Sequence, residues 1–431
     1  MTWKTWVLVI ASVLVSVILI EGQVFASDEK ERKKIVVFQD GTPSAVQRTV
    51  VALSESTVVL PLSFIDALAI ELPVDKSDRA LAFLLNYTVL GIHPVVAVYD
   101  DLAASVLSIT PALPGEVRLK ERYDWGLQRI GVDAARQEMP AVTGAGVKVA
   151  VVDTGIACGH PDLPLLIDGF NALPGGVSYC DDHGHGTHIA GIIAAQANHE
   201  AIRGAAPQVS LVAVKVLNFN GKGYLSYLLN GLQWIYNNQD EEHIRLVNMS
   251  LGFSADSLPL KRAIKKLFDH DTIMVASAGN SCSDDPGQDE GGGDDGEGAT
   301  CDTPQTTTVK YPAAYREVLA VTATNNNDQI AYYSLEGPEV DVAAPGGERE
   351  WTDKRILSTY LGDWYGLGSG TSQAAAHVTG ALALKLQQQR ALSLDDVRWL
   401  LQHTATVLMG YARTQQGWGL IAVEPLLATP R

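Results

Sequence analysis

The chain has 431 residues, 46% of them hydrophobic and 19% charged, which is the composition of a globular protein of two or three domains. Its formal net charge of −17 argues against nucleic acid and anionic membrane surfaces as partners.

The first 26 residues are typical of a secretory signal peptide. Lys4 is the only charge before Glu21, and an apolar or small-residue run extends over Val7–Ile20. Val24-Phe25-Ala26 then supplies small residues at the −3 and −1 positions of a cleavage site. An uncleaved anchor is the alternative, but the run is shorter than the ~20 residues that span a bilayer. We therefore expect an exported protein, secreted or periplasmic, without a stable membrane anchor.

Residues 27–115 form the next segment. Its patterns predict strands over Ile35–Phe38, Ala67–Leu72 and Val95–Tyr99, and a helix over Ser77–Leu85. Such a short mixture of strands and a helix indicates a small α+β domain. Residues 100–121 contain Pro111, Pro114 and Gly115 and are expected to be a linker, with the domain boundary within 101–122.

From residue 123 to residue 431 short apolar strands alternate with amphipathic helices. This alternation predicts an α/β domain with a mainly parallel central sheet flanked by helices on both faces. Ligands bind at the carboxyl ends of the strands in such a sheet, so polar motifs there are candidates for function. The expected strands are Val147–Val152, Leu211–Leu217, Leu246–Met249, Thr272–Ser277 and Val318–Thr322, and the expected helices are Thr187–Ala197, Tyr224–Tyr236 and Leu258–Phe268.

Four cysteines suit an oxidising compartment and allow three pairings. Their spacing favours two local disulfides, Cys158–Cys180 and Cys282–Cys301, each closing a loop of about 20 residues and contributing ~3 kcal/mol. Free buried thiols are the alternative. The second pair would close an acidic, glycine-rich surface loop at 283–303, for which calcium binding is a further alternative.

Three polar motifs carry the residues of a nucleophilic catalyst. Asp153 ends an apolar strand in Val151-Val152-Asp153-Thr154-Gly155, where a carboxylate can hold an imidazole. His185 lies in Asp182-His183-Gly184-His185-Gly186-Thr187-His188 at a helix start, which suits a general base. These histidines lack the spacing and the glutamate of a zincin helix. Ser372 lies between small residues at another helix start, where its hydroxyl and backbone N–H groups can meet a carbonyl.

Together these motifs resemble the subtilisin-like serine proteases, the subtilase family. Asp-Thr-Gly at 153–155, His-Gly-Thr-His at 185–188 and Gly-Thr-Ser at 370–372 match its three signature blocks in the family's order. The resemblance extends from about Trp125 to Ala428. It implies the three-layer subtilisin-like fold, preceded by a small α+β, ferredoxin-like prodomain that inhibits the enzyme until it is cut.

The resemblance also implies a role for each matching residue. Ser372 would be the nucleophile, His185 the base, Asp153 the group that orients the base, and Asn280 an oxyanion donor. Residues Ser250, Leu251 and Gly252 match the strand that pairs with an extended substrate. No cofactor is implied for the chemistry. A structural calcium ion is implied at Asp162 and Asn198, with a turn-capping Asp162 as the alternative.

One departure from the family lies beside the nucleophile. Subtilases commonly have methionine there, and this chain has Gln373. We expect a secreted, monomeric serine endopeptidase that is made as a zymogen, acts on polypeptides and is inhibited by its own propeptide. The alternatives are a catalytically silent binding protein with the same fold and, for the N-terminal segment, a substrate-recruiting domain.

Overall fold

The computed structural model describes residues 32–88, 92–106, 110–111, 122–164, 166, 168–198, 201–242, 244–281 and 308–431. The expected signal peptide at 1–26, the acidic loop at 283–303 and the Cys282–Cys301 pair lie outside these residues. The chain divides into two compact units, one of Met1–Leu102 with Ser257–Ala263 and one of Ala103–Asp256 with Ile264–Arg431.

The first unit has the ferredoxin-like order of elements that the resemblance implied. Four antiparallel strands lie in the order β2-β3-β1-β4, and the chain runs β-α-β-β-α-β. Apolar side chains such as Phe38, Val50, Ile70 and Leu84 form its core. The elements are β1 (Lys33–Phe38), α3 (Ser44–Leu53), β2 (Thr57–Leu62), η2 (Ser63–Ile65), β3 (Ala67–Glu71), α4 (Ser77–Asn86) and β4 (Val95–Asp100).

Three of these elements, α3, β2 and the short helix η2, were not expected from the sequence. The helix α3 is rich in β-branched residues, but Val46 and Val50 lie one turn apart and are both buried. The strand β2 contains Pro61, which removes a backbone donor. It is tolerated because β2 lies at the edge of the sheet.

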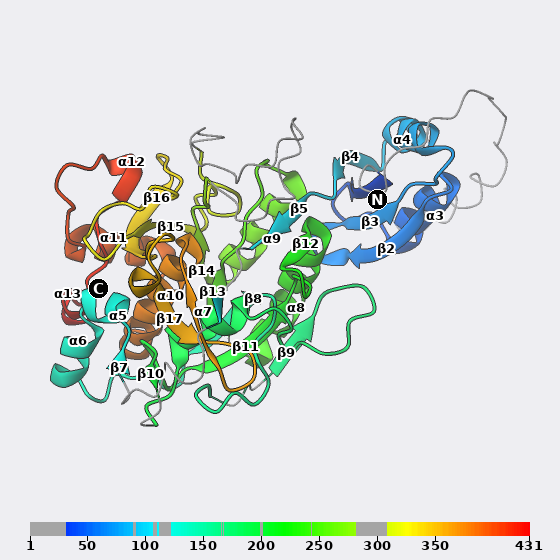
Figure 1. The fold of residues 1–431 in the computed structure, drawn as a ribbon. Coiled ribbons are helices and arrows are strands. Elements are labelled where there is room, and N and C mark those ends of the chain that lie inside the picture. Colours follow the sequence, from blue (N-terminus) through cyan, green and yellow to red (C-terminus); the bar gives the residue numbers. More distant parts are fainter. Residues whose placement is uncertain are drawn as a thin grey trace, which may run out of the picture. The chain divides into compact units, whose positions relative to one another are not determined.

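A seven-stranded parallel sheet is the centre of the second unit, as the alternation of strands and helices predicted. The strand order is β16-β15-β14-β13-β8-β11-β9 (Figure 1). Side chains of its central strands are almost completely buried, as expected for a sheet covered on both faces. The strands are β8 (Lys148–Asp153), β9 (Asp168–Asn171), β11 (Ser210–Lys215), β13 (Leu246–Met249), β14 (Ile273–Ser277), β15 (Leu319–Thr324) and β16 (Val340–Pro345).

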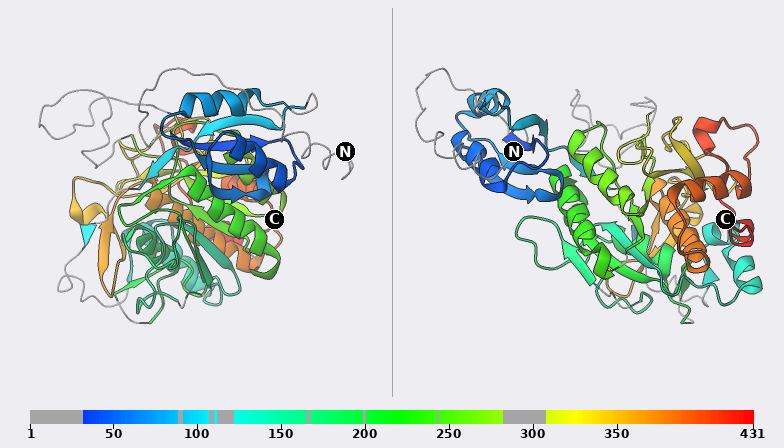
Figure 2. Two further views of the ribbon diagram at one scale, coloured as in Figure 1. Left: turned by 90° about the vertical axis from the view of Figure 1, so that its right-hand side faces the viewer. Right: turned by 180° about the vertical axis from the view of Figure 1, so that it is seen from behind.

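Helices lie on both sides of this sheet (Figures 1 and 2). The helices α7 (His185–Ala194) and α10 (Thr371–Gln388) pack against each other, and α10 crosses the strands β13 to β16. The helix α8 (Leu225–Glu242) lies against β8 and β9. The remaining helices are α5 (Trp125–Arg129), α6 (Val132–Glu138), α9 (Leu258–Asp269), η3 (Thr352–Lys354), α11 (Leu394–Thr404), α12 (Arg413–Gln416) and α13 (Val423–Ala428).

The expectation of a linker over residues 100–121 is wrong in part, because two short strands lie there. The strand β5 (Ala103–Ser105) pairs antiparallel with β12 (Lys222–Tyr224), and β6 (Thr110–Pro111) pairs with β18 (Tyr365–Gly368). Both partners are more than 100 residues away, so no local pattern reveals the pairing. The other short strands are β7 (Arg122–Tyr123), β10 (Ile202–Arg203) and β17 (Ile356–Thr359).

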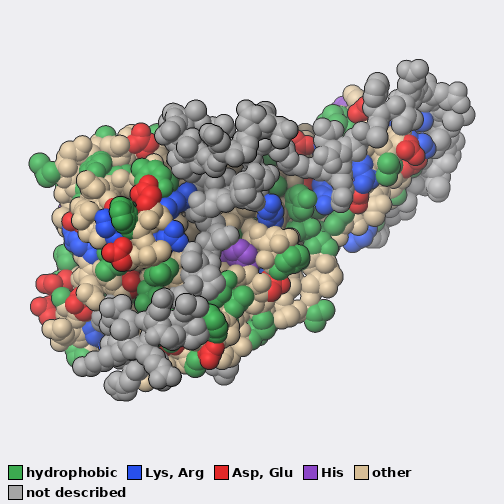
Figure 3. Space-filling view, in the orientation of Figure 1, with side chains coloured by type: hydrophobic (Ala, Val, Ile, Leu, Met, Phe, Trp, Pro, Cys, Tyr) green, Lys and Arg blue, Asp and Glu red, His purple; other side chains and the backbone are tan. Residues whose placement is uncertain are grey.

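Within the described part of the chain, no helix combines the length and hydrophobicity needed to cross a membrane. Acidic and basic side chains of the described residues are interspersed on the face shown in Figure 3. This mixture agrees with the composition, in which acidic residues outnumber basic ones.

Candidate active site

The Asp153 and His185 side chains form a buried hydrogen-bonded pair. The Nδ1 of His185 lies 2.8 Å from Oδ1 and 2.9 Å from Oδ2 of Asp153, and neither residue is exposed. Asp153 is the last residue of β8, and the backbone N–H of Thr154 also donates to its Oδ1. Because the carboxylate can only accept, His185 carries its proton on Nδ1 and presents Nε2 as a base.

Glycine allows His185 to begin a helix at this position. Gly184, just before α7, has φ +103°, and a Cβ on it would lie 2.0 Å from the ring of Tyr360. Gly186 approaches β8 so closely that a Cβ would lie 2.1 Å from the Gly155 carbonyl oxygen. The Gly-His-Gly sequence therefore brings the imidazole against the end of β8.

Ser372 is the second residue of α10 and is 6% exposed. The first N–H groups of a helix have no partner within it, and the Ser372 N–H makes no hydrogen bond with any described residue. The serine thus combines a hydroxyl with an open backbone donor, which is the arrangement that its sequence context predicted.

The Ser372 hydroxyl donates to the Ser250 carbonyl oxygen at 3.2 Å, and the Ser250 hydroxyl donates back to the Ser372 carbonyl oxygen at 3.1 Å. The Nε2 of His185 is buried and has no hydrogen-bond partner among the described residues. The Ser372 hydroxyl and Nε2 of His185 are therefore not hydrogen-bonded to each other. Such bonds commonly form only in the complex with substrate.

Asn280 lies beside the N-terminus of α10 with its amide held in one orientation. Its Oδ1 accepts from the backbone N–H of Thr371 at 3.1 Å and from the Thr371 hydroxyl at 3.2 Å. Because the oxygen is used in this way, the Nδ2 group is left to donate elsewhere. Asn280 follows β14 and thus lies at the carboxyl edge of the sheet.

Leu251 and Gly252 follow β13 and offer open backbone groups. Neither residue makes a backbone hydrogen bond with another described residue. The next residue, Phe253, pairs with Tyr311 in both directions. An extended peptide could therefore add to the chain at 251–252, where the resemblance expected substrate to bind.

Gln373 is buried and contacts a second histidine. Its Nε2 lies 3.5 Å from Nδ1 of His188, whose Nε2 donates to the carbonyl oxygens of Ile356 and Gly366. Burial lowers the pKa of His188 to about 3, so the ring is neutral and its Nδ1 accepts from Gln373. The glutamine that departs from the family pattern thus has its own polar partner.

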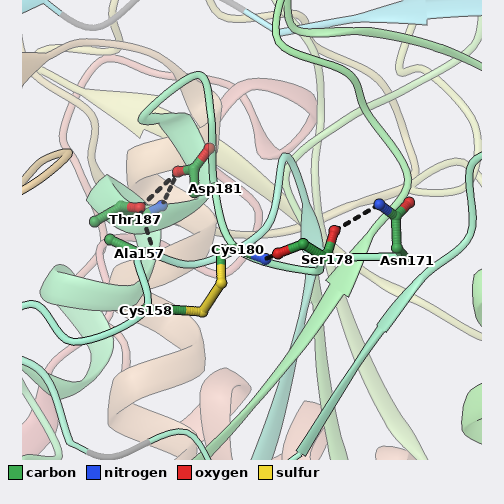
Figure 4. Close-up of a disulfide and its surroundings, with 7 residues drawn as sticks. All are labelled: Ala157, Cys158, Asn171, Ser178, Cys180, Asp181 and Thr187. Atoms are coloured by element: carbon green, nitrogen blue, oxygen red, sulfur yellow. Dashed lines mark hydrogen bonds between the residues drawn. A yellow bond between two sulfur atoms is a disulfide. The ribbon is translucent and has the colours of Figure 1, made fainter. Parts of the chain in front are cut away.

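The disulfide Cys158–Cys180 is present, as the cysteine spacing predicted (Figure 4). It joins the segment after Asp153 to the segment before His185. The Asp181 carboxylate reinforces this link, because its Oδ2 accepts from the backbone N–H and the hydroxyl of Thr187. The Thr187 hydroxyl oxygen in turn accepts from the Ala157 N–H at 2.9 Å.

The Asp162 and Asn198 segments, where the resemblance implied a calcium ion, lie together in the structure. The backbone N–H of Gln196 donates to the Asp162 carbonyl oxygen, and the Asn198 amide donates to that of Pro161. The described residues contain no group of three His, Cys, Asp or Glu side chains that could hold a metal.

Two further polar residues connect the segments of the site and were not singled out from the sequence. Asp181 accepts from the N–H groups of His183 and Gly184 as well as from Thr187. Lys215 ends β11 as a lysine after four apolar residues. A charged residue at the end of a buried strand is the one signal that could have identified it.

Comparison with known proteins gives the family. The model of the "Subtilase family" matches residues 144–419. Subtilisin BL of Lederbergia lenta is 38% identical over 300 residues, which are 70% of this chain and 97% of that protein. An alkaline protease of Alkalihalobacillus alcalophilus is 32% identical over 417 residues, or 96% of both chains. The minor extracellular protease Epr of Bacillus subtilis is 39% identical over 298 residues, but this chain spans only 40% of its length.

The fold and these matches define a protein of the serine endopeptidase class. The chain belongs to the subtilase family.

Proposed function

We propose that the protein is a secreted subtilase made as a zymogen, which hydrolyses peptide bonds through an acyl-enzyme on Ser372. The observation that carries the proposal is the buried Asp153–His185 pair. The open Ser372 N–H and the oriented Asn280 amide complete the set at the same edge of the sheet.

Each group has one step in the proposed reaction. When substrate binds, the Ser372 hydroxyl breaks its hydrogen bond to the Ser250 carbonyl oxygen. It then donates its proton to Nε2 of His185 as its oxygen attacks the peptide carbonyl. Asp153 holds Nδ1–H and stabilises the imidazolium. The Asn280 amide and the Ser372 N–H donate to the oxyanion. His185 then protonates the leaving amine, and water activated by His185 releases the acyl group.

Variants of Ser372 and Asn280 test these roles. Ser372→Ala should abolish hydrolysis of a chromogenic peptide by the purified, folded protein. Asn280→Ala should lower kcat by about 10²–10³ with little change in KM, the magnitude known for the corresponding donor in subtilisin, a member of this family. An Asn280→Ala enzyme with unchanged kcat would contradict the oxyanion role.

The pairing of the strands β5 and β6 supports a maturing cut between them. The backbone N–H of Val106, just after β5, donates to the Gly221 carbonyl oxygen, so this segment continues along β12. A Cβ on Gly221 would lie 2.9 Å from His183 and 3.0 Å from Val106 side-chain atoms, and the His183 and His185 rings are 6.4 Å apart. Val106 thus lies near His183, whose ring neighbours that of the proposed base His185.

Four residues after Val106, the chain pairs with β18, which ends at Gly368 just before Ser372. The strand β5 therefore pairs with a segment whose turn lies beside His183, and β6 pairs with a segment that ends four residues before Ser372. We propose that the maturing cut falls on a peptide bond between Val106 and Thr110. The propeptide would then be 27–106 or up to three residues longer, which narrows the sequence expectation of 27–115.

N-terminal sequencing of the purified enzyme tests this position. The first residue should fall between 107 and 110, and Ser372→Ala should accumulate as an uncut precursor. A mature N-terminus outside this window would contradict the proposed site. Cutting of Ser372→Ala in the absence of other proteases would contradict self-processing.

Export and calcium remain predictions of the sequence. The relative named an extracellular protease supports export. Calcium at Asp162 and Asn198 is tested by the melting temperature in EDTA. A fall that added Ca²⁺ reverses would support the site, and an unchanged melting temperature would argue against it.

A further inference from the structure

Lys215 is a buried cation whose three N–H donors are all used. It is 3% exposed, and its Nζ lies 2.6 Å from the Thr154 carbonyl oxygen, 2.6 Å from that of Leu217 and 2.7 Å from Oδ1 of Asp182. An ammonium group has three protons, so these acceptors account for every one of them.

The three acceptors belong to three different parts of the site. Thr154 directly follows Asp153, and Lys215 itself is the parallel partner of Asp153 between β11 and β8. Asp182 lies three residues before His185 in the loop that leads into α7. The ammonium therefore joins the segments that carry both members of the Asp153–His185 pair.

The third acceptor is the carbonyl oxygen of Leu217, and the chain after Leu217 leads into β12, the strand that pairs with β5. After Leu217 the chain turns through Asn218–Gly221, where the Asn218 N–H donates to the Lys222 carbonyl oxygen, and then enters β12. Through Leu217 the same ammonium thus fixes where this strand begins relative to the two catalytic segments.

We propose that Lys215 is a positioning residue that aligns Asp153 with His185 and fixes the β12 strand beside them. The inference rests on the proposed protease function. Lys215 touches neither the substrate nor the reacting hydroxyl, and it acts by holding three backbone segments at one point. A misplacement of about 1 Å in such a site can cost about 100-fold in rate.

A second buried lysine provides the matched control. Lys385 in α10 is 1% exposed, and its Nζ donates to the Thr429 carbonyl oxygen at 2.6 Å. Both lysines are buried ammonium groups bound to backbone carbonyls, but Lys385 lies more than three helical turns beyond Ser372. Lys385→Met removes a buried cation without touching the Asp153 or His185 segments.

The test compares purified Lys215→Met and Lys385→Met with the wild-type enzyme, once the wild type has been shown to hydrolyse the substrate. Both should melt at lower temperature. Lys215→Met should lower kcat on a small ester by about 100-fold, and on a peptide long enough to reach β12 it should also raise KM. Lys385→Met should keep the wild-type kcat and KM. If Lys215→Met keeps the wild-type kcat at a temperature where it is folded, Lys215 is only structural and the proposal fails.

Asp182 gives a second route if Lys215→Met does not fold. The Asp182 side chain is 51% exposed, so replacing it removes a half-exposed carboxylate and not a buried one. Asp182→Asn keeps an oxygen acceptor for Lys215 and should keep most of kcat, whereas Asp182→Ala removes the link between Lys215 and the loop and should lower kcat. Equal kcat in the two variants would contradict the proposal. A wild-type enzyme without hydrolytic activity would instead contradict the proposed function itself.

Discussion

The residue after the proposed nucleophile Ser372 separates this chain from the pattern common in its family. Gln373 is buried and lies within 3.5 Å of the neutral His188 ring. A methionine there is open to sulfoxide formation, which places a polar oxygen close to the catalytic hydroxyl. An amide has no sulfur to oxidise, and in this chain it also has a polar partner.

We therefore expect the enzyme to keep its activity in dilute hydrogen peroxide, and Gln373→Met to lose activity under the same conditions. Residual hydrolysis over time measures both. Gln373→Leu is the control, since it removes the amide without adding sulfur and should remain insensitive to peroxide. Rapid inactivation of the wild type with Ser372 unmodified would contradict the prediction.

At the same scale, the sequence predicted the residues that we propose carry the chemistry, but it did not single out the residues that hold them. Asp153, His185, Asn280 and Ser372 occur in recognisable motifs, and the structure brings the first two within 2.8 Å. Lys215 depends on acceptors from three separate segments. Contacts of that kind depend on the tertiary structure and have no spacing in the sequence.

At the scale of elements, the Cys158–Cys180 disulfide joins the loop after β8 to the loop before α7. Its half-cystines are 22 residues apart in the sequence. A link of this length restricts the unfolded chain and is expected to contribute about 3 kcal/mol to the free energy of unfolding.

The double variant Cys158→Ser/Cys180→Ser should lower the free energy of unfolding by about that amount. Urea denaturation measures it best in a Ser372→Ala background, which prevents self-digestion. Treatment of the parent protein with a reductant should approach the same value. An unchanged unfolding midpoint in the double variant would show that the disulfide contributes nothing to stability.

The elements themselves were predictable to different degrees. Five strands of the parallel sheet and the helices α7 and α8 follow from their apolar patterns, because burial on both faces demands continuous hydrophobic runs. The outer strands β9 and β16 were not expected from the sequence. The strands β5 and β6 could not be predicted. Each has two or three residues and exists through a partner far along the chain.

For the whole molecule, two buried histidines predict the response of stability to acid. Burial lowers the pKa of His188 to about 3 and that of His377 to about 4, whereas both have a value near 6.5 in the unfolded chain. Between these values the unfolded state binds more protons than the folded state. The free energy of unfolding therefore has its full value above about pH 7 and decreases as the pH falls below about 6.5.

Urea midpoints of the Ser372→Ala protein from pH 8 to pH 4 test this prediction. They should be constant at the alkaline end and decline steadily in acid. The variant His377→Gln, which lacks one of the two groups, should show a smaller decline over the same range. A midpoint that rises as the pH falls from 7 to 5 would contradict the assignment of neutral, buried rings.

For the whole molecule, we propose that the fold carries a working nucleophile at Ser372. Labelling with a fluorophosphonate probe, followed by mass spectrometry of the labelled peptide, tests it most directly. One label is expected on each folded, processed molecule, located on Ser372 and absent from Ser372→Ala. A folded, processed protein that takes up no label would contradict the account and favour a silent binding protein with the subtilase fold.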